Sequence, residues 1–286
     1  MKGFVTNQYG KLRKVLLCEP RYYRLMPCNE TAKSYLDRGQ ALDINLVYQE
    51  HQDLSKALAQ AGAQVIWIDP EEHMPYQVFT RDLGVVTAAG ALLGRFTYAF
   101  RQAEVEAAIP VVEQMVPIWR RIPEQDGLRF EGGDFMYLDD RRAVVGVGAR
   151  TTPGGARLVE RHMAELGVEV MAVPINHDYC HIDMVLNIVA ERVCVACLEL
   201  LPEKLVSRLK NERWQIVETT PEDVLRLLGN LLALDCGLVI SPSHNTRING
   251  ALRALGINVI EIKMEETMKG GGGLHCLTMP LERDPA

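Results

Sequence analysis

The stretch HIDMVLNIVAERVCVAC, residues 181–197, decides the fold. Two apolar runs flank the polar pair Glu191-Arg192, which is the pattern of a β-hairpin. A polar residue, Asp183, stands where the first run begins. Strand-like runs elsewhere in the chain begin in the same way, and the residues that open them are Asp82, Asp134, Asn230 and Cys276.

These five opening residues are spaced by 52, 49, 47 and 46 positions, and a period near 50 is typical of repeat architectures. Helical patterns with apolar residues three and four apart recur between them. They cover residues 45–62, 102–118, 154–166, 202–211, 221–229 and 245–255. Each unit is predicted to contain a strand, a helix, a strand and then a hairpin. Five such α/β units would close into a ring, with the opening residues around a central pore. The looser regularity of an ordinary α/β protein stays open as the alternative.

Composition limits the classes of protein and partner. The 286 residues are 48% hydrophobic and 24% charged, and no linker divides them, so one domain over residues 1–286 is expected. The net charge of −6 disfavours nucleic acid and anionic membranes as partners. No apolar run reaches the roughly 20 residues of a membrane span, and the first 20 residues lack a signal-peptide core, so a cytoplasmic location is expected.

The glycine-rich segment KGGGGLHCLTMP, residues 269–280, is the most unusual part of the sequence. Four consecutive glycines cost conformational entropy, which is reasonable where the backbone approaches or moves over a ligand. Cys276 follows directly and is the candidate nucleophile. A flexible linker beside a buried cysteine is the alternative.

Two further segments carry acid–base residues. His181 and Asp183 are two apart, so on a strand their side chains would share one face. Glu131 and Asp134 flank a glycine pair in FEGGD, and Asp82 follows Arg81 in QVFTRD. Taken singly, each has an alternative as a core histidine pair or a solvated turn. Together, carboxylates suit a planar cation with paired N–H donors, and a thiol with an imidazole suits covalent attack.

No cofactor or metal is expected. Cys194 and Cys197 lie in an apolar run without a second ligand pair, so they are predicted to be buried structural thiols. The glycine run lacks the Lys-Ser/Thr of a phosphate loop. The odd count of seven cysteines argues against a disulfide framework.

Taken together, FTRD, FEGGD, GARTTPGGA, HIDMVLNIV and GGGGLHCLT resemble the motifs of the guanidino-group modifying enzymes, the pentein superfamily. The resemblance runs from about residue 13 to 283, with the motifs in the family's order. Members include arginine deiminases, dimethylarginine dimethylaminohydrolases and amidinotransferases. Membership implies a five-fold pseudo-symmetric α/β propeller, consistent with the repeat, and a homodimer is expected by analogy.

The resemblance also implies roles for individual residues. Cys276 matches the nucleophile that forms an amidino-thioether, and His181 matches the general acid and base. Glu131 matches the carboxylate that orients that histidine. The positions that match substrate-binding residues are Asp82 and Asp183 for the guanidinium, Arg150 and Arg101 for a carboxylate, and Gly273 in the mobile loop.

Three functions follow from this resemblance as expectations. The first is hydrolysis at the guanidinium carbon of arginine or a related small guanidino substrate, releasing ammonia or an amine and a ureido product. The alternative is an amidinotransferase, and a remote alternative is a non-catalytic pentein binding protein. One departure concerns the substrate: Tyr76 stands where relatives often place Asp or Asn to hold an α-amino group. The substrate is therefore arginine, a modified arginine, or a guanidino acid without that amine.

Overall fold

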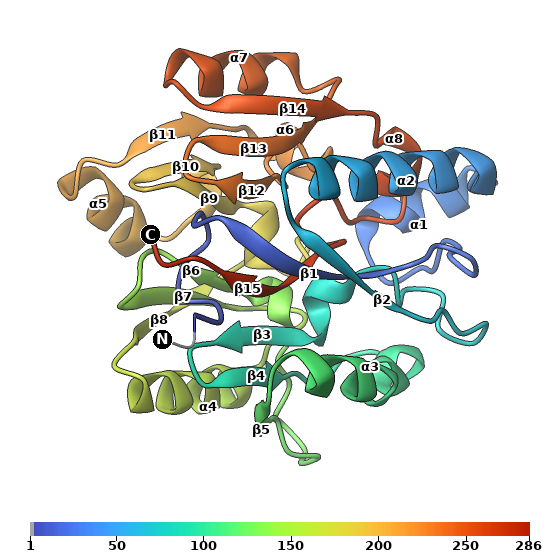
Figure 1. Cartoon of the computed structure of the whole chain (residues 1–286), viewed down its shortest axis with the longest axis horizontal. Helices are drawn as coiled ribbons and strands as arrows, with labels where there is room; N and C mark the ends of the chain where they lie inside the picture. Colours follow the sequence, from blue (N-terminus) through green and yellow to red (C-terminus); the bar gives the residue numbers. More distant parts are fainter. Residues whose placement is uncertain (1–2) are drawn as a thin grey trace.

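Five three-stranded sheets are arranged around a common centre in the computed structural model, which describes residues 3–286 (Figure 1). In four of them an antiparallel hairpin is followed by a helix and a strand parallel to the hairpin's second strand. The strands of these four sheets are β3 (Gly84–Thr87), β4 (Gly90–Leu93) and β5 (Ile118–Arg121); β6 (Phe135–Tyr137), β7 (Arg142–Val147) and β8 (Glu169–Pro174); β9 (Leu186–Ala190), β10 (Val193–Ala196) and β11 (Gln215–Glu218); and β12 (Leu232–Asp235), β13 (Leu238–Pro242) and β14 (Asn258–Ile262).

The fifth sheet joins the two ends of the chain. In it β1 (Leu12–Cys18) pairs antiparallel with β15 (Met279–Arg283) and parallel with β2 (Gln64–Ile68). The last strand thus completes the sheet that the first strand begins, and it closes the ring. The two strands run side by side through the middle of the molecule (Figure 1).

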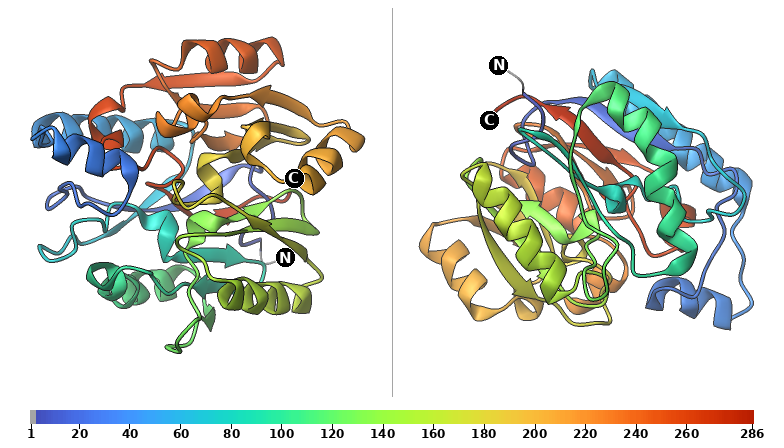
Figure 2. Two further views of the ribbon diagram at one scale, coloured as in Figure 1. Left: turned by 180° about the vertical axis from the view of Figure 1, so that it is seen from behind. Right: turned by 90° about the horizontal axis from the view of Figure 1, so that it is seen from below.

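Figure 2 shows the helices on the outside of the ring of sheets. They are α1 (Glu30–Asp37), α2 (Ile44–Gln60), α3 (Gln102–Met115), α4 (Pro153–Glu165), α5 (Glu203–Asn211), α6 (Pro221–Leu225), α7 (Thr246–Ala254) and α8 (Glu265–Met268). Their buried faces pack on the sheets, as with Leu54 and Leu58 of α2. Among the described residues no helix is long and apolar enough to cross a membrane.

The five-fold α/β propeller predicted from the spacing is confirmed, with two differences. Each unit holds three strands, because the second strand of the hairpin is also the strand that precedes the helix. The helix expected over residues 221–229 ends at Leu225, since Leu227 has φ of +59°, in the left-handed region. The short helices α1 and α8 were not predicted from the sequence pattern.

Short 3₁₀ turns place the opening residues at the centre. Asp82 lies in η1 (Thr80–Leu83), Asp134 in η3 (Gly132–Asp134) and Asp183 in η4 (Ile182–Met184), each just before the first strand of its unit. All five opening residues are buried, as the predicted convergence on a central pore requires.

Hydrogen bonds link these turns from one unit to the next around the pore. Asp134 Oδ1 accepts from Ile182 N at 3.1 Å, and Asn230 Oδ1 accepts from His275 N at 2.9 Å. The backbone continues the pattern, because Arg81 N donates to the Cys276 carbonyl at 3.1 Å. The fold therefore brings the opening turns of successive units into hydrogen-bond contact.

Candidate active site

Cys276 lies within the turn of residues 274–277 that precedes β15, with its side chain almost fully buried. Its Sγ accepts from Asn230 Nδ2 at 3.2 Å and lies 3.4 Å from Asp183 Oδ2. Burial, and then the charges of Asp183 and Asp82, raise the thiol's pKa well above its usual value. Without a bound substrate cation the sulfur is therefore protonated, and the thiol donates to Asp183.

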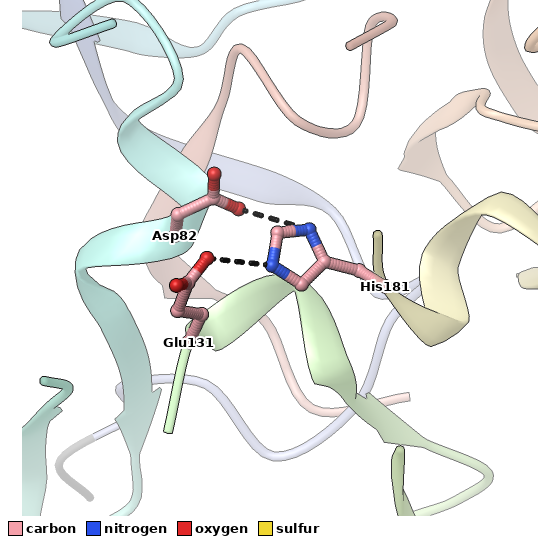
Figure 3. Close-up of side chains that lie close together, drawn as sticks. All are labelled: Asp82, Glu131 and His181. Carbon is pink, nitrogen blue, oxygen red and sulfur yellow. Dashed lines mark hydrogen bonds and ion pairs between the residues drawn. The ribbon is translucent and has the colours of Figure 1, made fainter. Parts of the chain in front are cut away.

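His181 lies between two carboxylates (Figure 3). Its Nε2 is 2.9 Å from Glu131 Oε2, and its Nδ1 is 3.5 Å from Asp82 Oδ1. Burial alone would lower the imidazole's pKa, but the charge of Asp82, the hydrogen bond to Glu131 and the charge of Asp134 raise it to about 9. At neutral pH the ring is an imidazolium that donates to Glu131 and forms a longer ion pair with Asp82, and it is a proton donor ready for a leaving amine.

The sequence placed His181 and Asp183 on one strand, and that prediction is wrong. His181 is extended but precedes η4, and Asp183 lies within that 3₁₀ turn. The two side chains still reach the same site from different directions. His181 contacts Glu131, whereas Asp183 contacts the Cys276 sulfur and His275 Nδ1, the latter at 2.7 Å.

Glu131 is held by a second cation. Arg150 Nη1 donates to its Oε2 at 3.0 Å. Burial would raise the pKa of this carboxyl, but Arg150 and His181 together lower it well below its usual value. The glycines after Glu131 leave room for the imidazole, because a Cβ on Gly133 would lie 2.7 Å from His181 Nδ1.

Asp82 and Asp183 each retain one carboxylate oxygen for a ligand. Within residues 3–286, Oδ1 of Asp82 and Oδ1 of Asp183 are buried and have no hydrogen-bond partner. A buried acceptor without a donor is costly, so a ligand that offers N–H groups would stabilise both. These oxygens are suited to the paired N–H groups of a guanidinium.

Arg101 and Arg150, the two arginines predicted to bind a substrate carboxylate, lie at the site. Most of their N–H groups already donate to other groups of the protein. Arg101 pairs with Asp82 Oδ2 at 2.7 Å and with Glu104 Oε2 at 2.8 Å. Arg150 binds Glu131 and also donates to the Cys28 carbonyl at 2.8 Å. Both guanidinium groups thus hold carboxylates of the site in position, whatever they contribute to a substrate.

A small cavity of about 20 Å³ lies among several of these groups. Its lining comprises Asn29, Tyr76, Phe79, Asp82, Arg101, Arg150, Cys180, His181, Gly270, Gly271, Gly272 and Cys276. Gly273, predicted to bind substrate, is buried beside this lining, where a Cβ would lie 2.8 Å from Asn230 Oδ1. The Tyr76 hydroxyl lies 3.1 Å from the Gly270 carbonyl and contacts the backbone of Met26.

One group of side chains has the composition of a metal site. Ligand atoms of Asp82, Glu131 and His181 lie within 4.8 Å of one another. However, Arg150 already neutralises Glu131, and both ring nitrogens of His181 face carboxylates as donors. These contacts favour a protonated imidazole over a metal ligand, because a metal requires the neutral ring.

Sequence reasoning missed the groups that support this site. Asn230 was recognised only as a member of the ring, and its spacing was the available signal. His275 stands directly before Cys276 and binds Asp183, and burial lowers its pKa to about 4, so a neutral ring donates there. Glu104, the partner of Arg101, has no sequence signal except its position three residues later.

The fold and the site together define a guanidino-group modifying enzyme of the pentein superfamily. The family model described as "N,N dimethylarginine dimethylhydrolase, eukaryotic" matches residues 23–283. The chain belongs to this family.

Relatives of established and unestablished function are similar to the chain. The uncharacterized protein YkgA of Bacillus subtilis (strain 168) is 28% identical over 283 residues, which cover 99% of this chain and 96% of that protein. An arginine deiminase of Mycobacterium marinum is 26% identical, over 85% of this chain and 66% of the deiminase. The chain thus spans about two thirds of the length of such curated deiminases.

A solved structure of a dimethylarginine dimethylaminohydrolase from Pseudomonas aeruginosa, complexed with citrulline, has the same fold. It has a TM-score of 0.80 at 22% identity and covers 94% of this chain and 99% of that one.

Proposed function

We propose that the chain hydrolyses a small guanidino compound through a covalent adduct on Cys276, releasing ammonia or an amine and a ureido product. One observation carries the proposal: the Cys276 thiol, the His181 imidazolium and Asp82 line one cavity, and Asp183 contacts the thiol from behind that lining, with an unpartnered oxygen on each of the two carboxylates. The family membership and the arginine deiminase relatives support the same class of reaction.

The first half of the reaction forms the adduct. The substrate guanidinium donates N–H groups to Asp82 and Asp183, and its positive charge favours ionisation of the nearby thiol. The Cys276 thiolate attacks the guanidinium carbon to give a tetrahedral intermediate. His181 then donates its proton to one nitrogen, the C–N bond breaks, and ammonia or an amine leaves an amidino-thioether.

The second half releases the product. The neutral His181 takes a proton from water, and the resulting hydroxide attacks the same carbon. The C–S bond breaks, the sulfur leaves as a thiolate, and the ureido product departs. Glu131 holds the imidazole in position throughout, through the contact of 2.9 Å.

The geometry also bears on which guanidino compound is preferred. Acceptors on both Asp82 and Asp183 favour a guanidinium with N–H groups on each terminal nitrogen, which a dimethylated nitrogen does not offer. Asp82 is the carboxylate among the lining residues, and it is assigned to the guanidinium. The Tyr76 hydroxyl already contacts backbone groups, so it is not available to hold an α-amino group. We therefore expect arginine and guanidino acids without an α-amine to react faster than dimethylarginine.

The test is a substrate panel of arginine, methylarginines, agmatine, citrulline and short guanidino acids. Ammonia, amine and ureido product would be measured for each. The expected result is equal amounts of ureido product and released ammonia or amine. No ureido product from any compound would refute a guanidino hydrolase, and faster release of dimethylamine than of ammonia would refute the stated preference.

An amidinotransferase shares the first half of this reaction and differs in what resolves the adduct. A labelled acceptor amine such as glycine, added to the same assays, separates the two. If label from the acceptor amine appears in the product, the chain is a transferase. Steady ureido product without label assigns the hydrolase.

A further inference from the structure

We propose that Asn230 is a positioning residue for the nucleophile, which holds the Cys276 sulfur and favours its thiolate form. The proposal rests on the function proposed above, in which Cys276 attacks the substrate. Asn230 lies between α6 and β12, is fully buried, and is one of the five opening residues around the pore.

The orientation of the Asn230 amide follows from its partners. Oδ1 accepts from the backbone N–H groups of His275 and Cys276, at 2.9 and 3.3 Å. A backbone N–H can only donate, so the oxygen must face these groups. The amide nitrogen therefore faces the Cys276 sulfur at 3.2 Å and the Asp183 carbonyl at 3.2 Å.

Comparison with Asp134 separates a structural role from a role at the thiol. Asp134 accepts from Ile182 N of the following unit, just as Asn230 accepts from His275 N of its following unit. Both side chains thus hold the next turn. An asparagine adds a donor that an aspartate lacks, and here this donor is directed at the sulfur. Holding the next turn requires only the amide oxygen, so it does not explain the contact between the amide nitrogen and the sulfur.

Two side chains contact the sulfur with opposite effects, and a backbone hydrogen bond from Gly273 also lowers the thiol's pKa. Asp183 accepts from the thiol and therefore favours the neutral form, whereas the Asn230 N–H favours the thiolate. When a guanidinium binds to the free Oδ1 of Asp183, its positive charge offsets the negative charge of the carboxylate that favours the neutral thiol. The Asn230 donor remains, so the balance moves toward the thiolate at the moment when attack is required.

Other charged groups act on the same sulfur. Asp82 raises the thiol's pKa from η1, and Arg81 on the same turn is a buried cation that interacts with Cys276. His275, adjacent in the chain, is neutral at physiological pH because burial lowers its pKa to about 4, and His181 is the imidazolium across the cavity. Of the side chains named here, Asn230 is the one whose N–H directly contacts the sulfur.

The experiment measures alkylation of Cys276 by iodoacetamide against pH, with mass spectrometry of the peptide that contains Cys276. Asn230→Asp keeps an acceptor oxygen and removes the donor, and Asn230→Ser replaces the amide with a hydroxyl on a shorter side chain. We expect the midpoint of the profile to move to higher pH by about one unit or more in both. That shift equals about tenfold slower alkylation at a fixed pH below the midpoint.

Asn249→Asp is the matched control. Asn249 is also buried, and its amide donates to the Pro242 carbonyl at 3.1 Å, away from the site. This variant is expected to keep the profile of the unaltered chain. Thermal unfolding of each variant reports any general loss of structure.

Two results would overturn the proposal. One is a folded Asn230→Asp or Asn230→Ser variant whose alkylation profile matches the unaltered chain. The other is failure of both to fold, which would assign Asn230 to the fold alone. Alkylation needs no turnover, so a chain that hydrolyses no guanidino compound yet shows the shift would refute the proposed function and leave the role of Asn230 standing.

Discussion

His181 lies between Asp82 and Glu131 and close to Asp134, so three carboxylates surround one imidazole. They raise its pKa from 6.5 to about 9, against the effect of burial. A histidine in this state can protonate a leaving amine over the whole neutral range. Its acid function is lost as the pH rises through about 9.

Glu131→Gln tests this dependence. The substitution removes one negative charge beside the imidazolium and leaves a neutral amide as its hydrogen-bond partner, so the pKa of His181 falls. We expect the alkaline limb of the kcat/KM profile to move to lower pH, and kcat to fall by about 10²-fold or more. The measurement is the pH profile of ureido product formation with the best substrate of the panel.

Glu50→Gln is the control for that experiment. Glu50 is buried and accepts from the backbone of Glu266 and Thr267, at 2.8 and 2.7 Å, and no contact links it to His181. Its alkaline limb should stay where it is in the unaltered chain. If the alkaline limb of Glu131→Gln also stays at the pH of the unaltered chain, the assignment of that limb to His181 is contradicted.

At the residue scale the sequence predicted which side chains meet, but not how they pair. Cys276, His181, Glu131, Asp82 and Asp183 do converge. That Arg101 binds Asp82 and Glu104 could not be predicted, because those contacts depend on the position of η1 against α3. The donor of Asn230 is likewise defined only when Oδ1 is seen to face the turn of Cys276.

At the scale of the element, 3₁₀ turns rather than strands present the site residues. The sequence pattern predicted the hairpins because alternating apolar residues indicate strands. A three-residue turn is too short to show a periodicity of its own. The difference matters, because His181 contacts Glu131 whereas Asp183, within the turn, contacts Cys276. Asp134 secures the turn of these two residues by accepting from Ile182 N.

Asp134→Asn tests this turn through stability. Burial raises the pKa of Asp134 from 3.8 to about 7. The folded chain therefore holds a proton that the unfolded chain releases, so this group's stabilisation is full below about pH 4 and is lost as the pH rises to about 7. Asparagine keeps the acceptor and cannot ionise. We expect the decline in unfolding free energy between pH 4 and 7 to become shallower.

The measurement is denaturant unfolding at several pH values. Asp126→Asn, at an exposed position between β5 and η3, serves as the control and should leave the slope unchanged. An unaltered slope in Asp134→Asn would show that Asp134 is ionised in the folded chain across this range.

At the scale of the whole molecule, one strand closes the ring. β15 completes the sheet of β1 and β2, and its Leu281 is fully buried in the core shared with β3 and β4. The spacing of the opening residues predicted the ring. The position of the closing strand in the sheet of the N-terminal strand could not be read from the spacing, because the pairing joins residues about 270 apart.

Leu281→Ala should therefore destabilise the whole fold and not merely its C-terminal end. A buried leucine truncated to alanine costs about 2–5 kcal/mol, measurable as a lower midpoint of denaturant unfolding. Leu255→Ala, on a side chain that is 37% exposed, should cost less than about 1 kcal/mol. Equal losses of unfolding free energy in both variants would show that the packing of β15 does not stabilise the closed ring.

The central claim is that Cys276 bonds covalently to the guanidinium carbon, and acid quenching during turnover tests it most directly. Mass spectrometry of the quenched, digested chain should find an amidino group on the peptide containing Cys276. Cys276→Ala should show no such adduct and lose activity by about 10³-fold or more. Undiminished formation of ureido product by Cys276→Ala, with no adduct in the unaltered chain, would contradict the account.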